Sequence, residues 1–138
     1  MKVSGRLAII VIVAVAALTV AAGFYTVELW KKDVDYGDVS IDTAIELMED
    51  NPDIVILDVR TASEYSEGHI EDAINIPVNE LETRLDELSK EDDILVYCRT
   101  GNRSSSAIQI MEDAGFTQLY HMHEGISVWT EQGYPVVQ

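Results

Sequence analysis

Two uninterrupted apolar runs, Ile54–Leu57 and Ile94–Tyr97, constrain the fold of this chain more than any other feature of its sequence. A strand with no polar residue on either face must be covered on both sides. This arrangement occurs mainly in parallel sheets that carry helices on both faces. The segments around these runs alternate between the periodicity of a strand and that of a helix. The sequence therefore predicts an α/β domain with a mainly parallel central sheet of about five strands, flanked by helices on both faces.

Turn residues and apolar spacing set the limits of the predicted elements. Strands are expected at residues 36–39, 54–57, 73–76, 94–97 and 119–122. Helices are expected at residues 41–50, 62–66, 79–88, 103–114 and 126–132. Ser40 and Asn79 have side chains that commonly cap the start of a helix, and Gly68, Gly115 and Gly133 follow predicted helices, where glycine often ends them.

The N-terminal segment differs from the rest of the chain. Leu7–Tyr25 is an uncharged, apolar run of 19 residues, which is about long enough to cross a bilayer as a helix. Lys2 and Arg6 precede this run, and Trp30 follows it where aromatic side chains favour the membrane surface. We therefore predict that the chain is attached to a membrane through residues 7–25.

This prediction sets the domain limits and the location of the protein. Residues 1–32 are predicted to form a transmembrane anchor or signal segment, and residues 33–138 a folded domain. The positive charges before the apolar run favour a single-pass protein of the cell membrane whose domain lies outside the cytoplasm. Alternatively, cleavage after Ala21-Ala22-Gly23 would release a secreted or periplasmic domain.

Charge and cysteine content exclude several classes of protein. The net charge is -16, and no acidic residue precedes Glu28, so the predicted domain is strongly acidic. Such a surface argues against nucleic-acid binding, because the phosphate backbone would be repelled. The chain has one cysteine, which excludes an internal disulfide and a cysteine-based zinc cluster. That cysteine is either an apolar filler of the core or a nucleophile.

Cys98 follows the strand Ile94–Tyr97 and begins a polar loop that leads into a helix. Gly101 lets this loop curl, so that several N–H groups and the helix dipole can point at one centre. Arg99 and Arg103 add two permanent positive charges. All of these features stabilise a thiolate, so we predict that Cys98 is ionised and accessible at neutral pH. A core cysteine is the alternative, which the two arginines and the glycine disfavour.

Other short motifs accompany this loop. Upstream stand Asp58-Val59-Arg60, Glu64-Tyr65, Gly68-His69-Ile70 and Ala73-Ile74-Asn75-Ile76-Pro77, and downstream stand Gly125 and Trp129. In order and spacing, these motifs resemble the signatures of single-domain rhodanese-type thiosulfate sulfurtransferases, over most of residues 36–135. The resemblance implies a rhodanese-like fold and an enzyme that transfers sulfur.

The resemblance also implies a mechanism. The Cys98 thiolate takes sulfur from a small anionic donor such as thiosulfate, holds it as a persulfide, and passes it to a thiol or protein acceptor. Covalent catalysis of this kind needs one cysteine and no cofactor. The substrate-binding groups would come from the loop after the nucleophile, namely Arg99, Thr100, Gly101, Asn102 and Arg103.

Two supporting residues follow the first central strand. Asp58 is expected to buttress the active loop, and the resemblance implies that Arg60 pairs with an acid near Glu71. The family commonly has two glycines where this chain has Glu124-Gly125. We therefore expect the Glu124 side chain to affect the loop near the pocket and the choice of donor.

Three histidines and one tryptophan have less specific interpretations. His69 is expected in a turn or in packing, and Trp129 in the core. His121 and His123 have the spacing to share one side of a strand, but two ligands without a third make a weak metal site. We predict no metal centre.

Two other functions stay open. The domain is either a sulfurtransferase or, alternatively, a module that relays sulfur to one protein or binds a partner without turnover. A small-oxyanion phosphatase or arsenate reductase is less consistent with the loop. Four residues separate Cys98 from Arg103, whereas phosphatases of similar fold keep one more.

Overall fold

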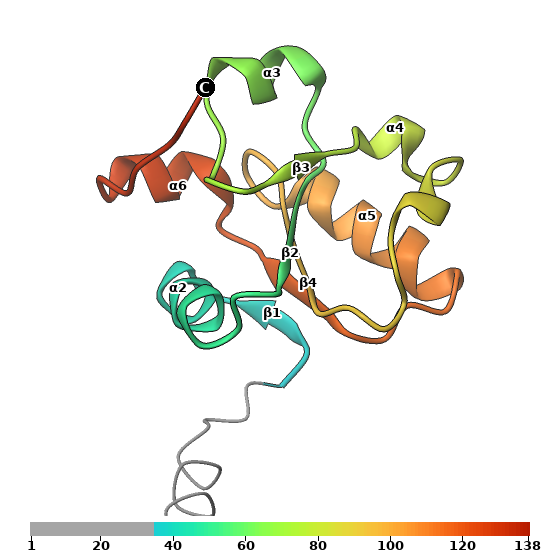
Figure 1. Cartoon of the computed structure of the whole chain (residues 1–138). Helices are drawn as coiled ribbons and strands as arrows, with labels where there is room; N and C mark the ends of the chain where they lie inside the picture. The colour runs from blue at the N-terminus through green and yellow to red at the C-terminus, as the bar shows by residue number, and fades with distance from the viewer. Residues whose placement is uncertain (1–34) are drawn as a thin grey trace, which may run out of the picture. The chain divides into compact units, whose positions relative to one another are not determined.

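The two apolar runs form the centre of a five-stranded parallel sheet (Figure 1). The computed structural model describes residues 35–138, and the strand order within them is β1-β5-β4-β2-β3. The strands are β1 (Gly37–Val39), β2 (Val55–Asp58), β3 (Ile74–Asn75), β4 (Ile94–Tyr97) and β5 (Leu119–Met122). Every pairing between them is parallel, which confirms the predicted sheet.

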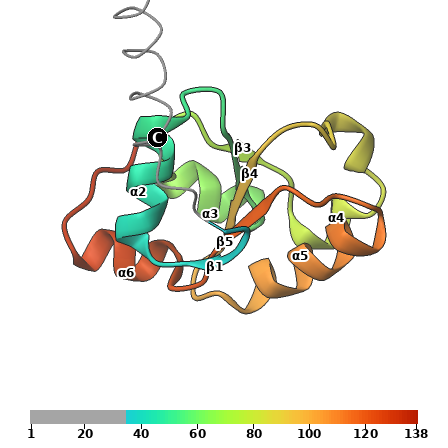
Figure 2. The ribbon, with the colours of Figure 1, turned by 90° about the horizontal axis from the view of Figure 1, so that it is seen from below.

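Helices cover both faces of this sheet (Figure 2). α2 and α6 lie on one face, α4 and α5 lie on the other, and α3 lies beyond the carboxyl ends of the strands (Figures 1 and 2). The helices are α2 (Ile41–Asp50), α3 (Ala62–Glu67), α4 (Val78–Leu81), α5 (Asn102–Asp113) and α6 (Gly125–Glu131), with a 3₁₀ turn, η1, at Leu85–Glu87.

The anchor predicted in residues 1–32 lies outside the described residues. Between residues 35 and 138, none of the helices has the length and apolar character that crossing a bilayer requires. The membrane attachment and the location of the domain therefore stay predictions.

The apolar core lies around β2 and β4. Leu57 and Val96 are completely buried and share one cluster with Ala107 and Met111 of α5. All four residues of β4 are buried, so the loop that follows this strand starts inside the protein. Cys98 belongs to the same cluster, and the nucleophile predicted from the sequence is therefore part of the core.

α2 begins and ends where the sequence predicts. The Ser40 hydroxyl accepts a hydrogen bond from the Thr43 backbone N–H at 3.3 Å, as expected of an N-cap. The Glu124 carboxylate accepts from the Ile41 N–H at 2.8 Å, and a negative charge there is favourable because the helix dipole is positive at this end. Glu124 thus joins the end of β5 to α2 and acts as a cap of that helix.

The helix predicted at residues 79–88 is wrong. α4 ends at Leu81, and Pro77, not Asn79, stands at its N-cap. Thr83 N–H bonds to the Glu80 carbonyl and Arg84 N–H to the Leu81 carbonyl, which are the i to i+3 bonds of a 3₁₀ turn. The Thr83 hydroxyl also donates to the Glu80 carbonyl at 2.9 Å and so competes for an acceptor that an α-helix would use.

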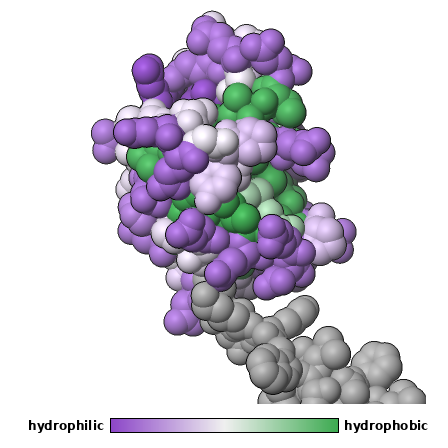
Figure 3. Space-filling view, turned by 90° about the vertical axis from the view of Figure 1, so that its left-hand side faces the viewer, coloured by the Kyte–Doolittle hydropathy of each residue, from purple (hydrophilic) through white to green (hydrophobic). Residues whose placement is uncertain are grey.

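Apolar side chains gather among charged ones on the face that α2 and α6 cover (Figure 3). Met48, Ile54, Ile70 and Trp129 help to line a hollow of about 370 Å³ there. The Trp129 ring is buried, and its indole N–H donates to the Pro135 carbonyl at 2.9 Å. Trp129 is therefore a packing residue, as predicted.

A buried ion pair closes the carboxyl end of β2. Arg60 Nη2 lies 2.6 Å from Asp58 Oδ2, with both side chains almost wholly buried, and the same nitrogen donates to the Gly68 carbonyl at 2.7 Å. The expected partner near Glu71 is therefore wrong. Asp58 is two residues away and already faces the guanidinium, while Glu71 is exposed.

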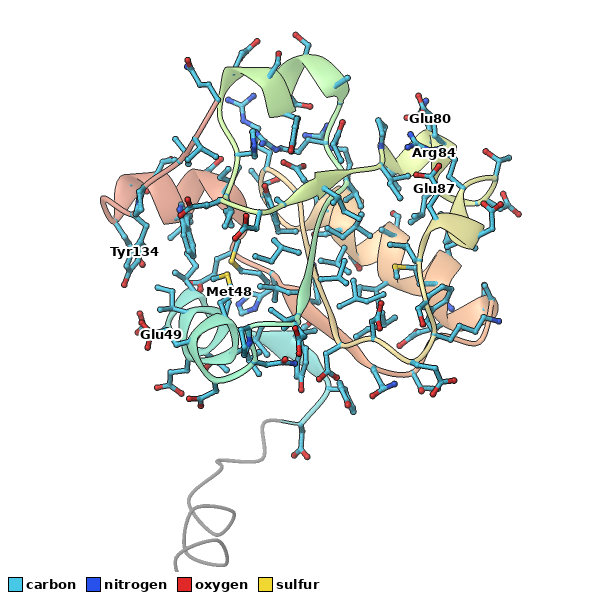
Figure 4. The ribbon with its side chains drawn as sticks, viewed as in Figure 1. Met48, Glu49, Glu80, Arg84, Glu87 and Tyr134 are labelled. Atoms are coloured by element: carbon cyan, nitrogen blue, oxygen red, sulfur yellow. The ribbon has the colours of Figure 1, made fainter. Side chains whose placement is uncertain are left out.

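The Asp58–Arg60 pair should matter for stability. In Asp58→Asn, the buried guanidinium loses its compensating charge, and we expect the free energy of unfolding to fall by roughly 3 kcal/mol in urea denaturation. Glu87→Gln is the control, because Arg84 binds Glu80 and Glu87 on the exposed side of α4 and η1 (Figure 4). This control should keep a midpoint close to that of the parent protein. Equal midpoints for the two variants would contradict the assignment.

Candidate active site

The loop from Cys98 to Ser104, called the active loop below, leaves the carboxyl end of β4 and leads into α5. Gly101 adopts a φ of +94°, and a side chain there would collide with the His123 carbonyl. The positive φ and the close backbone contact together explain why the sequence has glycine at this position.

The N-terminus of α6 holds the active loop from the other side. Ile126 and Ser127 donate their backbone N–H groups to the carbonyl oxygens of Cys98 and Arg99, at 2.9 and 3.1 Å. Gly125 has a φ of +73°, and a Cβ there would collide with the Arg99 carbonyl. The glycine of the C-terminal signature is therefore required so that α6 can approach the loop.

The Cys98 sulfur receives hydrogen bonds from the loop and from α5. The Gly101 N–H lies 3.1 Å from Sγ, and the Ser104 hydroxyl lies 3.3 Å from it. Burial by itself raises the pKa of the Cys98 thiol. The Ser104 hydroxyl and the backbone N–H groups of Ser104, Thr100 and Gly101 outweigh burial and bring the pKa below its ordinary value. The arrangement thus favours a thiolate.

The accessibility of Cys98 differs from the prediction. The residue is 1% exposed, because it continues a fully buried strand and the active loop curls over it. Cys98 does not itself line the neighbouring pocket, whose wall includes Arg99, the next residue of the active loop.

That pocket has a volume of about 290 Å³ and lies between the active loop, α3 and α6. It has both positive and negative side chains in its wall. The residues that line it are Arg60, Glu64, Glu67, Gly68, Arg99, Ile126, Ser127, Thr130 and Val136. Arg99 is exposed, so it is the arginine of the active loop that can meet an anion entering the pocket.

Arg103, which the sequence predicts to bind the substrate, forms an ion pair within the protein. Its guanidinium binds Glu64 of α3 through two contacts, at 2.6 and 2.8 Å. The hydrogen bonds from Arg103 hold the pKa of Glu64 at about 2. The same carboxylate accepts from the Thr61 N–H in a capping box, so Arg103 joins α5 to the start of α3.

The remaining site residues of the sequence prediction divide into two groups. Thr100 and Gly101 place backbone N–H groups near the sulfur, whereas the side chains of Thr100 and Asn102 are exposed. Asp58 and Arg60 lie at the neighbouring strand end, and Arg60 reaches the pocket. The structure thus brings these residues to one edge of the sheet.

Sequence analysis missed Ser104 as a donor to the sulfur. It lies on the buried side of α5 with Ala107 and Met111, at helical spacing. A serine in an otherwise apolar stripe, six residues after the cysteine, is the signal that would have identified it. Glu64 belongs to the Glu64-Tyr65 motif, but 39 residues separate it from Arg103, so the sequence does not indicate their ion pair.

The two histidines of the weak metal pair differ in burial and in their hydrogen-bond partners. His121 is buried against Ser104, whereas His123 is exposed and contacts the Val39 carbonyl through Nδ1 at 2.9 Å. Within residues 35–138, no three side chains of histidine, cysteine, aspartate or glutamate gather to hold a metal ion. His69 stacks on Tyr65, with ring centroids 3.7 Å apart, in the packing role expected of it.

Comparison with known proteins places these features in a family. Residues 40–132 match the model of the rhodanese-like domain. A sulfurtransferase from Allochromatium vinosum is 29% identical over 100 residues, which cover 72% of this chain and 94% of that protein. The thiosulfate sulfurtransferase GlpE from Coxiella burnetii is 36% identical, over 56% of this chain and 72% of the relative.

Solved structures and longer relatives also match this chain. A rhodanese-related protein from Thermoplasma volcanium superposes with a TM-score of 0.65 at 34% identity, over 74% of this chain and 98% of that one. The chain spans only 32% of the length of a tRNA uridine(34) hydroxylase from Enterobacter sp. that it also matches. The match to the domain model covers more than half of the sequence, from the cap of α2 to the end of α6, and it includes the active loop. This chain belongs to the rhodanese-like domain family.

Proposed function

We propose that this protein is a sulfurtransferase that carries sulfane sulfur on Cys98. One observation carries the proposal: a ring of N–H and O–H donors surrounds a buried sulfur and brings its thiol pKa below the ordinary value. A thiolate is the nucleophilic form of cysteine, and the same donors suit the negative charge of a persulfide. Relatives named as sulfurtransferases support the reaction class.

Two displacement steps complete the proposed reaction. In the first, the Cys98 thiolate attacks the outer sulfur of thiosulfate, the sulfur–sulfur bond of the donor breaks, and sulfite leaves with the electron pair. In the second, an acceptor thiolate attacks the outer sulfur of the Cys98 persulfide and releases the Cys98 thiolate. No net electron transfer or cofactor is needed, because each step exchanges one nucleophile for another at sulfur.

Arg99 supplies the positioning charge in this proposal. It is exposed at the pocket, whereas the Arg103 charge is compensated by Glu64. This pairing also argues against the phosphatase and arsenate reductase alternatives, which need an arginine free to bind an oxyanion next to the cysteine. Hydrolysis of an aryl phosphate without any response to thiosulfate would support those alternatives.

The relay alternative differs in its acceptor. A module that serves one dedicated protein would form the Cys98 persulfide but would not transfer sulfur to cyanide or to small thiols. A pocket of about 290 Å³ adjoins the active loop and could admit a small donor or acceptor, so we place turnover first.

The first prediction concerns Cys98 itself. Intact mass spectrometry after treatment with thiosulfate should show a mass gain of about one sulfur atom, lost again when cyanide is added. Cys98→Ser should show neither the gain nor thiosulfate:cyanide activity, because an alcohol is not ionised at neutral pH. Activity that persists in this variant would overturn the proposal, and so would failure of Cys98 to react with iodoacetamide in the folded protein.

A second prediction tests the charge at the pocket. Arg99→Gln should raise the KM for thiosulfate about two- to fivefold, as expected for loss of an exposed attraction to an anion. The alkylation rate of Cys98 by uncharged iodoacetamide should change little. Arg84→Gln serves as the control, because it removes the same charge from α4 and η1, far from the pocket. A KM for thiosulfate that is equal in both variants would refute the role of Arg99.

A third prediction tests the hydroxyl donor. Ser104→Ala removes one hydrogen bond to the thiolate, so the Cys98 thiol pKa should rise and alkylation at pH 7 should slow about three- to tenfold. The rate profile should move to higher pH, since a larger fraction of the sulfur stays protonated. Ser105→Ala, an exposed change on the same turn of α5, should leave the profile in place. Identical profiles for the two variants would show that Ser104 does not stabilise the thiolate.

A further inference from the structure

A row of hydrogen bonds runs from the protein surface to the Cys98 sulfur. Asp38 Oδ1 lies 2.8 Å from His121 Nδ1, and His121 Nε2 lies 2.8 Å from the Ser104 hydroxyl oxygen. That hydroxyl lies 3.3 Å from Sγ. The Asp38 side chain is 74% exposed, whereas His121, Ser104 and Cys98 are buried. Solvent is therefore connected to the sulfur through two buried side chains.

Four elements of the fold bring these residues together. β1 pairs with β5 so that Asp38 stands opposite His121, and α5 packs on the same face of β4 and β5. Cys98 follows β4, the other neighbour of β5. The residues of the row come from four separate segments, so their alignment reflects the tertiary fold and not local sequence.

The Ser104 hydroxyl has one proton and three acceptors within reach. These acceptors are Cys98 Sγ, the Gly101 carbonyl at 3.0 Å and His121 Nε2. The proton can serve only one of them well at a time. The protonation state of His121 therefore decides where this proton points.

Asp38 selects the state of the imidazole. A carboxylate only accepts hydrogen bonds, so the contact at Nδ1 requires a proton on that nitrogen. In neutral His121, Nε2 is then bare and takes the Ser104 proton away from the sulfur. In charged His121, Nε2–H donates to the Ser104 oxygen, which leaves the hydroxyl proton to the Gly101 carbonyl and the Cys98 thiolate, and the charged thiolate is the favoured acceptor of the two.

The surroundings of His121 leave these partners in control. Asp38 contacts it from β1 and Ser104 from α5, and Cys98 lies beyond Ser104. Arg103, next to Ser104 on α5, pairs with Glu64. The acids of α2 lie on the opposite face of the sheet (Figure 2).

We propose that His121, oriented by Asp38, is a positioning residue that acts on Cys98 through the Ser104 hydroxyl and couples the ionisation of the sulfur to its own protonation. This inference rests on the proposed function, since it assigns a regulator to the same nucleophile. His121 is not a catalytic residue, because its contact with the sulfur passes through Ser104. Both ring nitrogens of His121 have hydrogen-bond partners in this row, so the position of the ring is explained without a bound metal ion.

The test is the pH dependence of Cys98 alkylation by iodoacetamide in the full chain. The parent protein should show two inflections, because the thiol and His121 titrate as a coupled pair. His121→Gln keeps an amide donor near Ser104 but removes the charge. It should show one inflection, and at pH 5.5 it should react about threefold or more slowly than the parent, since the variant lacks the positive charge that a protonated His121 supplies. His123→Gln, two residues along and directed at the Val39 carbonyl, should behave like the parent.

A double-mutant cycle identifies the route of the coupling. In a Ser104→Ala background, His121→Gln should have little further effect on the alkylation rate, because the connection is already cut. An effect of the same size in both backgrounds would overturn the proposal, as would a second inflection that survives in His121→Gln.

An NMR measurement covers the case in which a variant fails to fold or the sulfur fails to alkylate. The His121 ring signals, titrated with pH, should follow a different curve after Cys98→Ala. The curve should not depend on Cys98 once Ser104→Ala is present. Curves that are unaffected by Cys98→Ala would refute the coupling. Asp38→Asn changes an exposed side chain and should alter the parent curve.

These readouts need no sulfur donor, so they separate the two proposals. A coupled titration without persulfide formation would refute the sulfurtransferase and keep the role of His121. Persulfide transfer on Cys98 without a coupled titration would support the sulfurtransferase and refute the role of His121.

Discussion

Everything at this site depends on hydrogen bonds that offset the burial of one sulfur atom. Cys98 extends a completely buried strand, and burial alone would keep its thiol protonated and inert. Donors from the active loop and α5 reverse that effect. They can do so only because the backbone turns sharply at Gly101 and α6 approaches closely at Gly125. Two glycines and one strand end thus determine the chemistry available to the domain.

The ion pairs of the domain secure the loop more than they act on substrate. Arg60 is held by Asp58 within the closed end of β2, and Arg103 is held by Glu64 at the start of α3. The Arg103–Glu64 pair links α5 to α3, and Arg60 also joins the end of β2 to the Gly68 carbonyl. Of Arg60, Arg99 and Arg103, only Arg99 has no ion pair with an acidic side chain among the contacts of residues 35–138, which is why the proposed function assigns it the positioning charge.

The fold could be predicted well from the sequence, and the site only in part. Fully apolar runs such as Ile94–Tyr97 have few alternatives to a central parallel strand, so the sheet followed directly. The prediction of one helix over residues 79–88 was wrong because an α-helix and a series of 3₁₀ turns place apolar residues at similar intervals over so short a distance. The predicted partner of Arg60 was wrong for another reason, which also explains why the Arg103–Glu64 pair was not predicted. An arginine can meet any nearby acid, and which acid is near depends on tertiary packing. For the same reason, the burial of Cys98 and the row through His121 were not visible before the strands were aligned.

The strong negative charge of the chain opposes the proposed site, which holds a thiolate and receives an anionic donor, and distance resolves the conflict. Charges exposed to solvent are screened beyond about 8 Å at physiological ionic strength, and the many acids of the domain lie mostly on its surface. The Gly101 N–H and the Ser104 hydroxyl lie within 3.3 Å of the sulfur, in a region from which water is largely excluded. Electrostatic interactions there are stronger per charge than at the surface. A few oriented dipoles can therefore dominate the ionisation of Cys98, while the net charge of the chain affects only how often an anionic donor arrives. The dipoles near Cys98 act on its ionisation, whereas the net charge of the chain acts on the approach of an anion. An acidic domain can therefore keep a reactive thiolate.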